Sequence, residues 1–165
     1  MKKRKIIFVC TGNTCRSVIA ELLFKKMVSD EIKNNPGKKE ILENLEITSA
    51  GVAPVPGMNT AAGTVRILRE EGIEAAGHKA RRLTAGEARE AYLILVMEER
   101  QRNEVFRIAG CCGEKIHHLN EFLDGREGDI SDPFGHSLEM YAECRDDIKK
   151  ALARLLKKLL EGDIR

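Results

Sequence analysis

The feature that most constrains the fold is a short apolar run near the start of the chain, followed at once by a turn and a helix. Residues 6–9 read Ile-Ile-Phe-Val, which is typical of a strand buried on both faces. Residues 17–27 then place their apolar side chains at helical spacing. A buried strand that leads into a helix is the first half of a β-α-β unit, so this pattern favours a parallel sheet.

The same alternation continues along the chain. Further strands are predicted at residues 45–49, 92–96 and 115–119. One helix is predicted to begin after Asn59 as its cap, and another at Thr84, which opens a capping box. Two further helices are predicted at residues 98–107 and 137–160, and a polar turn is predicted at residues 34–39. We therefore expect an α/β fold: a single three-layer domain over residues 1–165, in which a four-stranded parallel sheet has helices on both faces.

Charge and hydropathy exclude several classes of protein. The chain has 28 Lys and Arg against 26 Asp and Glu, a net charge of +2, which argues against broad binding to nucleic acid. Residues 2–5 are basic but lead into only four apolar residues, too few for a signal peptide, and no run is long enough to cross a membrane. We expect a cytoplasmic monomer with no nucleic-acid or membrane partner.

The turn after the first strand carries the residues that indicate a chemistry. It reads Cys10-Thr11-Gly12-Asn13-Thr14-Cys15-Arg16-Ser17. Ligands of open α/β sheets bind at the carboxyl ends of the strands. A short loop with a glycine that opens a helix can direct its backbone N–H groups at an anion. No Gly-Lys-Ser/Thr follows, so this is not a nucleotide-binding Walker loop, and we predict a phosphate-binding loop after the first strand.

Each polar residue of the loop has a predicted role. Cys10 lies at the end of the strand, where a positive cradle would favour a nucleophilic thiolate. Arg16 offers a planar fork that can hold two phosphate oxygens. Ser17 can donate a hydrogen bond to the thiolate, and Asn13 can hold the loop through its side chain. The remaining predicted substrate-binding residues of the loop are Thr11, Gly12, Thr14 and Cys15. The alternative interpretation is a capped helix start with a buried cysteine.

The sequence resembles the low-molecular-weight protein tyrosine phosphatase family nearly end to end. The elements that carry the resemblance are residues 9–17, Ala20-Glu21, Thr48-Ser49-Ala50-Gly51, Gly77-His78, residues 81–84 and Asp132-Pro133-Phe134-Gly135. The resemblance implies one phosphatase domain, with Cys10 as the nucleophile that forms a thiophosphoryl intermediate. It also implies that Asp132 is first the general acid and then the general base. Ser49 and His78 match residues that brace the loop by hydrogen bonds, whereas Val18 stands where the family usually has proline.

The residues around Asp132 agree with that role. An aspartate before proline is held extended, and Phe134 stands beside it. Such a carboxyl group can protonate a leaving atom and then activate the water that cleaves a phosphocysteine. Taken alone, the same pattern also fits a simple turn that begins with aspartate.

Thr14 is the most informative residue for the substrate. Members that resemble the tyrosine phosphatases usually carry an aliphatic residue there, whereas a bacterial subgroup that resembles the protein-arginine phosphatases carries threonine. A hydroxyl and the Asp132 carboxylate can together orient a planar guanidinium, and Phe134 can stack on it. We therefore expect phosphorylated proteins as substrates, with phosphoarginine preferred and phosphotyrosine as the alternative.

Other functions fit the sequence less well. Thiol-coupled arsenate reductases use two further cysteines as a relay, but Cys111 and Cys112 are adjacent and displaced from that position. With His117 and His118 they match no standard zinc spacing, so we expect no metal and no cofactor. A protein that only binds phosphorylated ligands would lack the nucleophile or the acid, and both are present. The basic side of the last helix is read as a solvated face.

The remaining cysteines have more ordinary interpretations. Cys15 could form a reversible disulfide with Cys10 that protects it from further oxidation, as the resemblance also suggests, or it could be a buried structural residue. Cys144 lies on the last predicted helix, where packing is expected.

Overall fold

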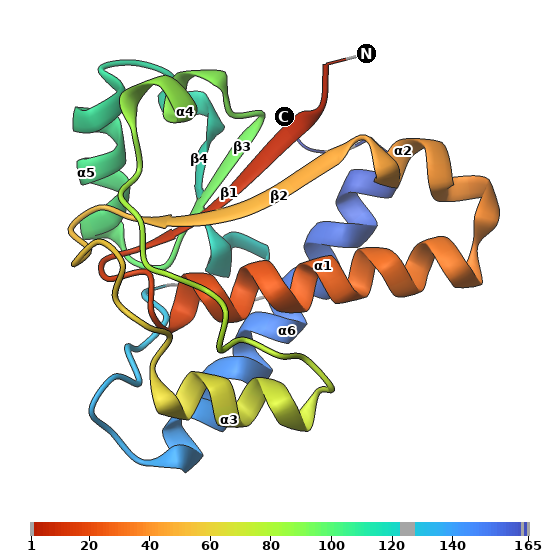
Figure 1. Cartoon of the computed structure of the whole chain (residues 1–165). Helices are drawn as coiled ribbons and strands as arrows, with labels where there is room; N and C mark the ends of the chain where they lie inside the picture. Colours follow the sequence, from red (N-terminus) through yellow and green to blue (C-terminus); the bar gives the residue numbers. More distant parts are fainter. Residues whose placement is uncertain (1, 123–127, 163, 165) are drawn as a thin grey trace.

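The protein is an α/β domain built on four parallel strands, as the sequence predicts. The computed structural model describes residues 2–122, 128–162 and 164. The strands are β1 (Arg4–Cys10), β2 (Leu45–Gly51), β3 (Leu93–Val96) and β4 (Ile116–His118). They pair in the order β2-β1-β3-β4, and every pair is parallel (Figure 1). The predicted fold class is therefore confirmed.

Helices cover both faces of this sheet. The described helices are α1 (Arg16–Asn34), α2 (Lys39–Glu43), α3 (Ala62–Glu70), α4 (Ala85–Glu90), α5 (Glu99–Ala109) and α6 (Leu138–Glu161). Short 3-10 helices lie at Pro36–Lys38, Gly113–Lys115 and Leu119–Phe122. In Figure 1, α1, α3 and α6 lie on one side of the sheet, and α4 and α5 lie on the other. None of the helices in the described ranges is long and apolar enough to span a membrane.

The all-apolar run of β1 follows from this three-layer arrangement. Ile6 and Phe8 belong to the core on the side of α1, α3 and α6. Ile7 and Val9 belong to a second core formed with α4 and α5. Successive side chains of a strand point to opposite faces, so a strand covered on both faces needs apolar residues at every position.

Two predicted boundaries on the first half of the chain are corrected by the structure. The first helix continues to Asn34 rather than ending near Met27, and much of the expected polar turn at 34–39 is the 3-10 helix that leads into α2. Asn59 is not a helix cap: α3 begins at Ala62 with Ala61 at the cap position, and Asn59 instead bridges to Lys79. A capping residue type predicts a helix start only if the following backbone turns at once. The capping box at Thr84 and the cap at Ser137 are confirmed.

The cysteines at the end of α5 also differ from the expectation. Cys111 and Cys112, for which the sequence suggested neither a relay nor a zinc site, are joined by a disulfide. Cys10, Cys15 and Cys144 are free and buried.

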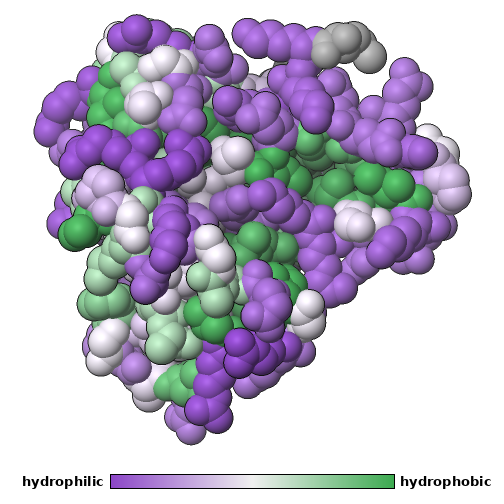
Figure 2. All heavy atoms as spheres, viewed as in Figure 1, coloured by the Kyte–Doolittle hydropathy of each residue, from purple (hydrophilic) through white to green (hydrophobic). Residues whose placement is uncertain are grey.

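A shallow apolar groove lies on the surface away from the loop after β1. It runs between α1 and the outer strand β2, and Figure 2 shows it as a patch of green side chains among purple ones. The apolar residues that line it are Val28, Ile32, Leu42, Leu45 and Ile47.

The strand order places a crevice at the carboxyl end of β1. The chain leaves β1 for β2 on one side and later returns to β3 on the other side, so the connections diverge between β1 and β3. Open α/β sheets bind their ligands at such a point. Cys10 ends β1 there, and Met97 and Glu98 follow the neighbouring end of β3.

The contact between α3 and α6 gives a test of the packing. A Cβ atom at Gly63 would lie 2.6 Å from the ring of Tyr141. We expect Gly63→Ala to lower the free energy of unfolding by about 1–2 kcal/mol in urea denaturation, because overpacking outweighs the helix propensity of alanine. Gly86→Ala in α4 is the control, since its Cβ would meet nothing within 4 Å. Equal stability of the two variants would contradict this account of the interface.

Candidate active site

The loop after β1 forms the floor of a cavity of about 310 Å³. The residues that line it are Cys10, Thr11, Gly12, Thr14, Cys15, Arg16, Ala53, Val55, Met58, Asp132 and Phe134. These residues come from three separate segments: the β1–α1 loop, the chain after β2, and the chain before α6. The fold therefore brings the two ends of the predicted site, Cys10 and Asp132, to one cavity.

The sulfur of Cys10 lies among hydrogen-bond donors. The backbone N–H of Asn13 donates to Cys10 Sγ at 3.2 Å, and the hydroxyl of Ser17 lies 3.0 Å from the same sulfur. Asn13 Nδ2 donates to Ser17 Oγ at 2.8 Å, which leaves the hydroxyl hydrogen of Ser17 free to point at the sulfur. Both donors can hydrogen-bond the sulfur when Cys10 acts as a nucleophile, and such a bond strengthens when its acceptor becomes charged.

Asn13 holds the loop in this shape. Its φ is 55°, in the left-handed region that asparagine tolerates better than most residues. It is fully buried. Its Nδ2 also donates to Ser49 Oγ at 2.9 Å, and its Oδ1 accepts from the backbone N–H of Arg81 at 3.1 Å. One side chain therefore connects the loop with β2 and with the segment before α4.

Ser49 and His78 contact the loop as the family resemblance implies. Ser49 accepts from Asn13 and donates its own hydrogen to a carboxylate oxygen of Glu21 on α1. His78 Nε2 lies 3.1 Å from the backbone oxygen of Asn13, so the tautomer that carries a hydrogen on Nε2 donates to it. The sequence did not assign Glu21 a role, and its contact with Ser49 orients the serine hydroxyl.

Arg16 is the most deeply buried charge of the site. Its side chain is only 2% exposed. Nη1 donates to the carboxylate of Glu98 and to the backbone oxygen of Ile130 at 2.8 Å, while Nη2 lies 3.5 Å from Asp132 Oδ2. Burial works to lower the pKa of Arg16, but the hydrogen bond to Glu98 and the nearby Cys10 and Asp132 overcome it, so the pKa lies above its usual value.

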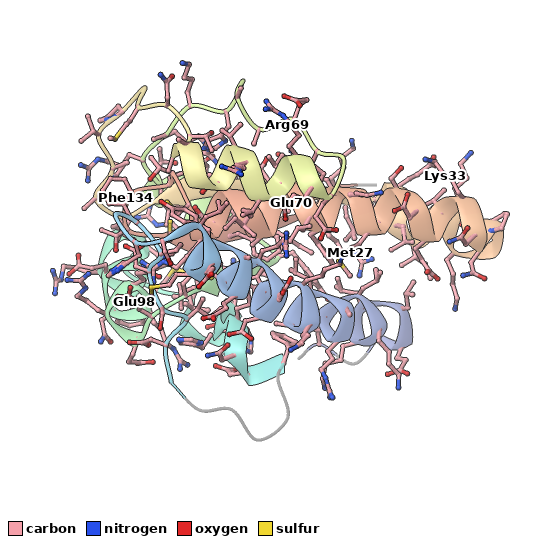
Figure 3. The ribbon with its side chains drawn as sticks, turned by 90° about the horizontal axis from the view of Figure 1, so that it is seen from below. Met27, Lys33, Arg69, Glu70, Glu98 and Phe134 are labelled. Carbon is pink, nitrogen blue, oxygen red and sulfur yellow. A yellow bond between two sulfur atoms is a disulfide. The ribbon has the colours of Figure 1, made fainter. Side chains whose placement is uncertain are left out.

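Asp132 and Phe134 stand at the mouth of the cavity. Asp132 Oδ1 accepts from the backbone N–H of Phe134 at 3.1 Å, which orients the carboxylate, and about half of its side chain is exposed. Phe134 is 54% exposed although it is a large apolar residue. In Figure 3, Phe134 and Glu98 lie at the same end of the molecule, far from Lys33 at the other end of α1.

Thr14 and Cys15 form the inner side of the loop. Both are buried and line the cavity, and Thr14 Oγ1 lies 3.8 Å from Cys15 Sγ. Cys15 Sγ also lies 3.7 Å from the hydroxyl of Tyr141 on α6. Burial raises the pKa of Cys15, so its thiol stays protonated at neutral pH, and it also raises that of Cys144 to about 12. The reversible disulfide between Cys10 and Cys15 stays a prediction.

Two polar residues of the site were missed by the sequence analysis. Glu98 pairs with Arg16, and the buried Gln101 accepts from the backbone N–H of both Met97 and Glu98 while donating to Thr11 Oγ1 at 3.2 Å. A signal was present, because Glu98 follows the carboxyl end of β3, next to β1 in the sheet. A prediction of the strand order, in addition to the strand positions, would have pointed to Glu98.

The apolar wall of the cavity was also missed. Val55 and Met58 lie three residues apart in a turn closed by a hydrogen bond from Met58 N to Val55 O at 3.1 Å. Backbone hydrogen bonds fix the preceding segment to the loop, from Val52 N to Cys10 O and from Ala53 N to Thr11 O, both at 3.0 Å.

Within the described ranges, no group of three or more His, Cys, Asp and Glu residues is arranged to hold a metal ion.

Comparisons with known proteins agree with this geometry. A family model described as low molecular weight phosphotyrosine protein phosphatase matches residues 5–163. The protein-arginine-phosphatase of Bacillus subtilis is 36% identical over 154 residues, which cover 93% of this chain and 95% of that protein. The low molecular weight protein-tyrosine-phosphatase Etp of Escherichia coli K12 is 31% identical over 159 residues, covering 96% of this chain and 97% of that protein.

One solved structure is informative about chemistry in a relative. It is a YwlE arginine phosphatase mutant in which a serine replaces a cysteine, and the active-site serine is phosphorylated. It matches with a TM-score of 0.82 and 34% identity, over 94% of this chain and 95% of that chain.

The pair between Arg16 and Glu98 gives a test of the charge balance. Glu98→Gln removes the carboxylate from a buried guanidinium, and we expect a loss of about 1–3 kcal/mol in the free energy of unfolding. Inorganic phosphate should raise the melting temperature of this variant more than that of the unchanged protein, because a bound anion replaces the missing negative charge. Glu99→Gln, an exposed neighbour, is the control. Equal stabilisation of all three proteins by phosphate would rule out this role for Glu98.

Proposed function

Because the chain belongs to the low molecular weight phosphotyrosine protein phosphatase family, we propose that it hydrolyses phosphoarginine on proteins through a phosphocysteine intermediate. The observation that carries the proposal is the position of Cys10 Sγ. It accepts from the Asn13 N–H and contacts the Ser17 hydroxyl at the floor of a cavity that Arg16 and Asp132 also line. A cysteine nucleophile, a guanidinium and a carboxyl group in one cavity are the groups that nucleophilic phosphoryl transfer needs.

The first step is proposed as attack by the Cys10 thiolate on phosphorus. A sulfur–phosphorus bond forms while the bond from phosphorus to the leaving guanidinium nitrogen breaks, and Asp132 donates its proton to that nitrogen. Arg16 stabilises the charge on the transferring group through the N–H groups of Nη2 and Nε, since both N–H groups of Nη1 are directed at Glu98 and Ile130. The distance of 3.5 Å between Arg16 Nη2 and Asp132 Oδ2 supports a common substrate for the two groups.

The second step is proposed as hydrolysis of the phosphocysteine. The Asp132 carboxylate takes a proton from a water molecule, whose oxygen attacks phosphorus as the sulfur–phosphorus bond breaks. Inorganic phosphate leaves, Cys10 returns to the thiolate, and Asp132 is protonated again. Ser17 supports both steps, because a donor at the sulfur stabilises the thiolate as the leaving group.

The preference for phosphoarginine is supported by Thr14, Asp132 and Phe134. All three line the cavity, so a hydroxyl, a carboxylate and an exposed aromatic ring are available to one guanidinium. A relative from Bacillus subtilis is named a protein-arginine-phosphatase, which adds to the support. The alternative substrate is phosphotyrosine. Etp, which is 31% identical, is named a protein-tyrosine-phosphatase, and the apolar side chains of Val55 and Met58 could pack against an aryl ring.

We propose that the enzyme acts in the cytoplasm and that its active form is a monomer.

The role of the nucleophile is tested by substitution. Cys10→Ser should lower kcat/KM for a generic aryl phosphate by about 10³-fold or more, because a serine hydroxyl at neutral pH is a much weaker nucleophile than a thiolate. The purified variant should also carry a phosphate on the substituted side chain after incubation with substrate, detected by mass spectrometry. Cys144→Ser, in the buried core of α6, is the control for a cysteine outside the cavity. Full activity of Cys10→Ser would refute the mechanism.

The choice of substrate is tested by Thr14. We expect the unchanged enzyme to have a higher kcat/KM for phosphoarginine peptides than for matched phosphotyrosine peptides. Thr14→Val and Thr14→Ile, which remove the hydroxyl, should lower this ratio about 5- to 50-fold. Thr14→Ser keeps the hydroxyl and should retain the preference. If the unchanged enzyme prefers phosphotyrosine, or if all variants share one ratio, the assignment to phosphoarginine is wrong.

A further inference from the structure

A second cavity, of about 180 Å³, lies directly behind the loop that carries Asp132. Ile130, Ser131 and Pro133 line this second cavity, whereas Asp132 and Phe134 line the active-site cavity. Successive residues of one segment therefore face two different cavities. The far wall comes from α6, and in Figure 3 Phe134 lies beside the first turns of that helix.

The second cavity is lined by acidic groups. Asp129, Glu143 and Asp147 contribute three carboxylates, of which Asp147 already interacts with another group, and no Lys, Arg or His is found among the described lining residues. Glu143 is exposed and makes no ion pair with another described residue. Asp129 accepts from the backbone N–H of Glu99 at 2.9 Å and lies 3.2 Å from His118 Nε2, so it is held in place. The cavity offers hydrogen-bond acceptors and negative charge.

Asn120 gives a separate indication that a donor belongs there. It is 6% exposed and lines the cavity, and its Nδ2 donates to the backbone oxygen of Gly128 at 2.6 Å. Its side-chain oxygen has no hydrogen-bond partner within the described part of the chain. A buried acceptor without a donor is destabilising, so a ligand group that reached it and donated a hydrogen bond would be favoured there.

The shape of the site favours an organic cation over a metal ion. The carboxylates of the cavity are not gathered into a metal-holding group among the described residues. The cavity volume of about 180 Å³ exceeds that of a bare ion. Met140 adds an apolar side to it, which suits the methylene groups of a long basic side chain.

We propose that this cavity is a subsite for a basic side chain, Lys or Arg, that lies within a few positions of the phosphorylated residue in the protein substrate. The proposal rests on the proposed function only in that the substrate is a phosphorylated protein. Both cavities share the wall at residues 130–134, so we assign them to neighbouring residues of one substrate segment. The subsite selects the sequence around the phosphorylated residue rather than the residue itself.

The subsite is tested with paired peptides. Each pair differs only by Lys or Gln at one position within four residues of the phosphorylated residue, and both a phosphoarginine and a phosphotyrosine series are made. At one position we expect Lys to raise kcat/KM about 3- to 10-fold over Gln, with the effect shrinking as NaCl is added. Dissociation constants for a Cys10→Ala variant, which has no nucleophile at this position, should show the same preference for Lys without turnover. The subsite can therefore be judged even if the phosphoarginine preference, or hydrolysis itself, proves wrong.

Two substitutions on α6 make the test specific. Glu143→Gln should remove the preference for Lys, and Glu143→Lys should reverse it toward a peptide with Glu at that position. Glu139→Gln is the matched control, because it removes the same charge from the same helix outside the cavity and should keep the preference. The proposal is overturned if Lys and Gln peptides behave alike at every position, or if Glu139→Gln and Glu143→Gln lower the ratio equally.

Discussion

The site depends on how Asn13 holds the loop around the sulfur of Cys10. Its left-handed backbone costs about 1–2 kcal/mol in a non-glycine residue, and its buried side chain offsets this with hydrogen bonds to Ser17, Ser49 and Arg81. In that conformation its own N–H points at the sulfur. The hydrogen bond it gives to Ser17 also directs the serine hydroxyl to the sulfur, so one residue sets both contacts.

Charge balance is the second constraint. Arg16 is almost fully buried, and a buried guanidinium is tolerated only with partners. Glu98 just after β3, the backbone of Ile130 and the carboxylate of Asp132 supply them. The guanidinium thereby links the start of α1 to the segment after β3 and to the loop that carries Asp132. The same loop separates the active-site cavity from the acidic cavity behind it. Residues 130–134 therefore contribute both to the proposed chemistry and to the proposed preference for a basic residue in the substrate.

Predictions from the sequence succeeded where the pattern was local and strongly periodic. The apolar run of β1, the capping box at Thr84 and the long final helix follow from side-chain spacing. The predictions failed where a residue that resembles part of a local motif instead contacts a distant part of the chain. Asn59 has the side chain of a helix cap, yet its backbone pairs with Lys79. Glu98 reads as a charged residue at a helix start, and its partner is 82 positions away in sequence.

By itself the sequence determined the parallel α/β fold, the loop after the first strand and the residue types that a phosphatase of this family needs, because these depend on periodicity and on short motifs. Only the tertiary structure decided which distant residues meet. It placed Glu98 on Arg16, Val55 and Met58 beside the loop, and three carboxylates with Asn120 behind the acid loop. The physical reason is that the burial and pairing of a charged or polar group depend on strand order and helix packing, which no local pattern encodes.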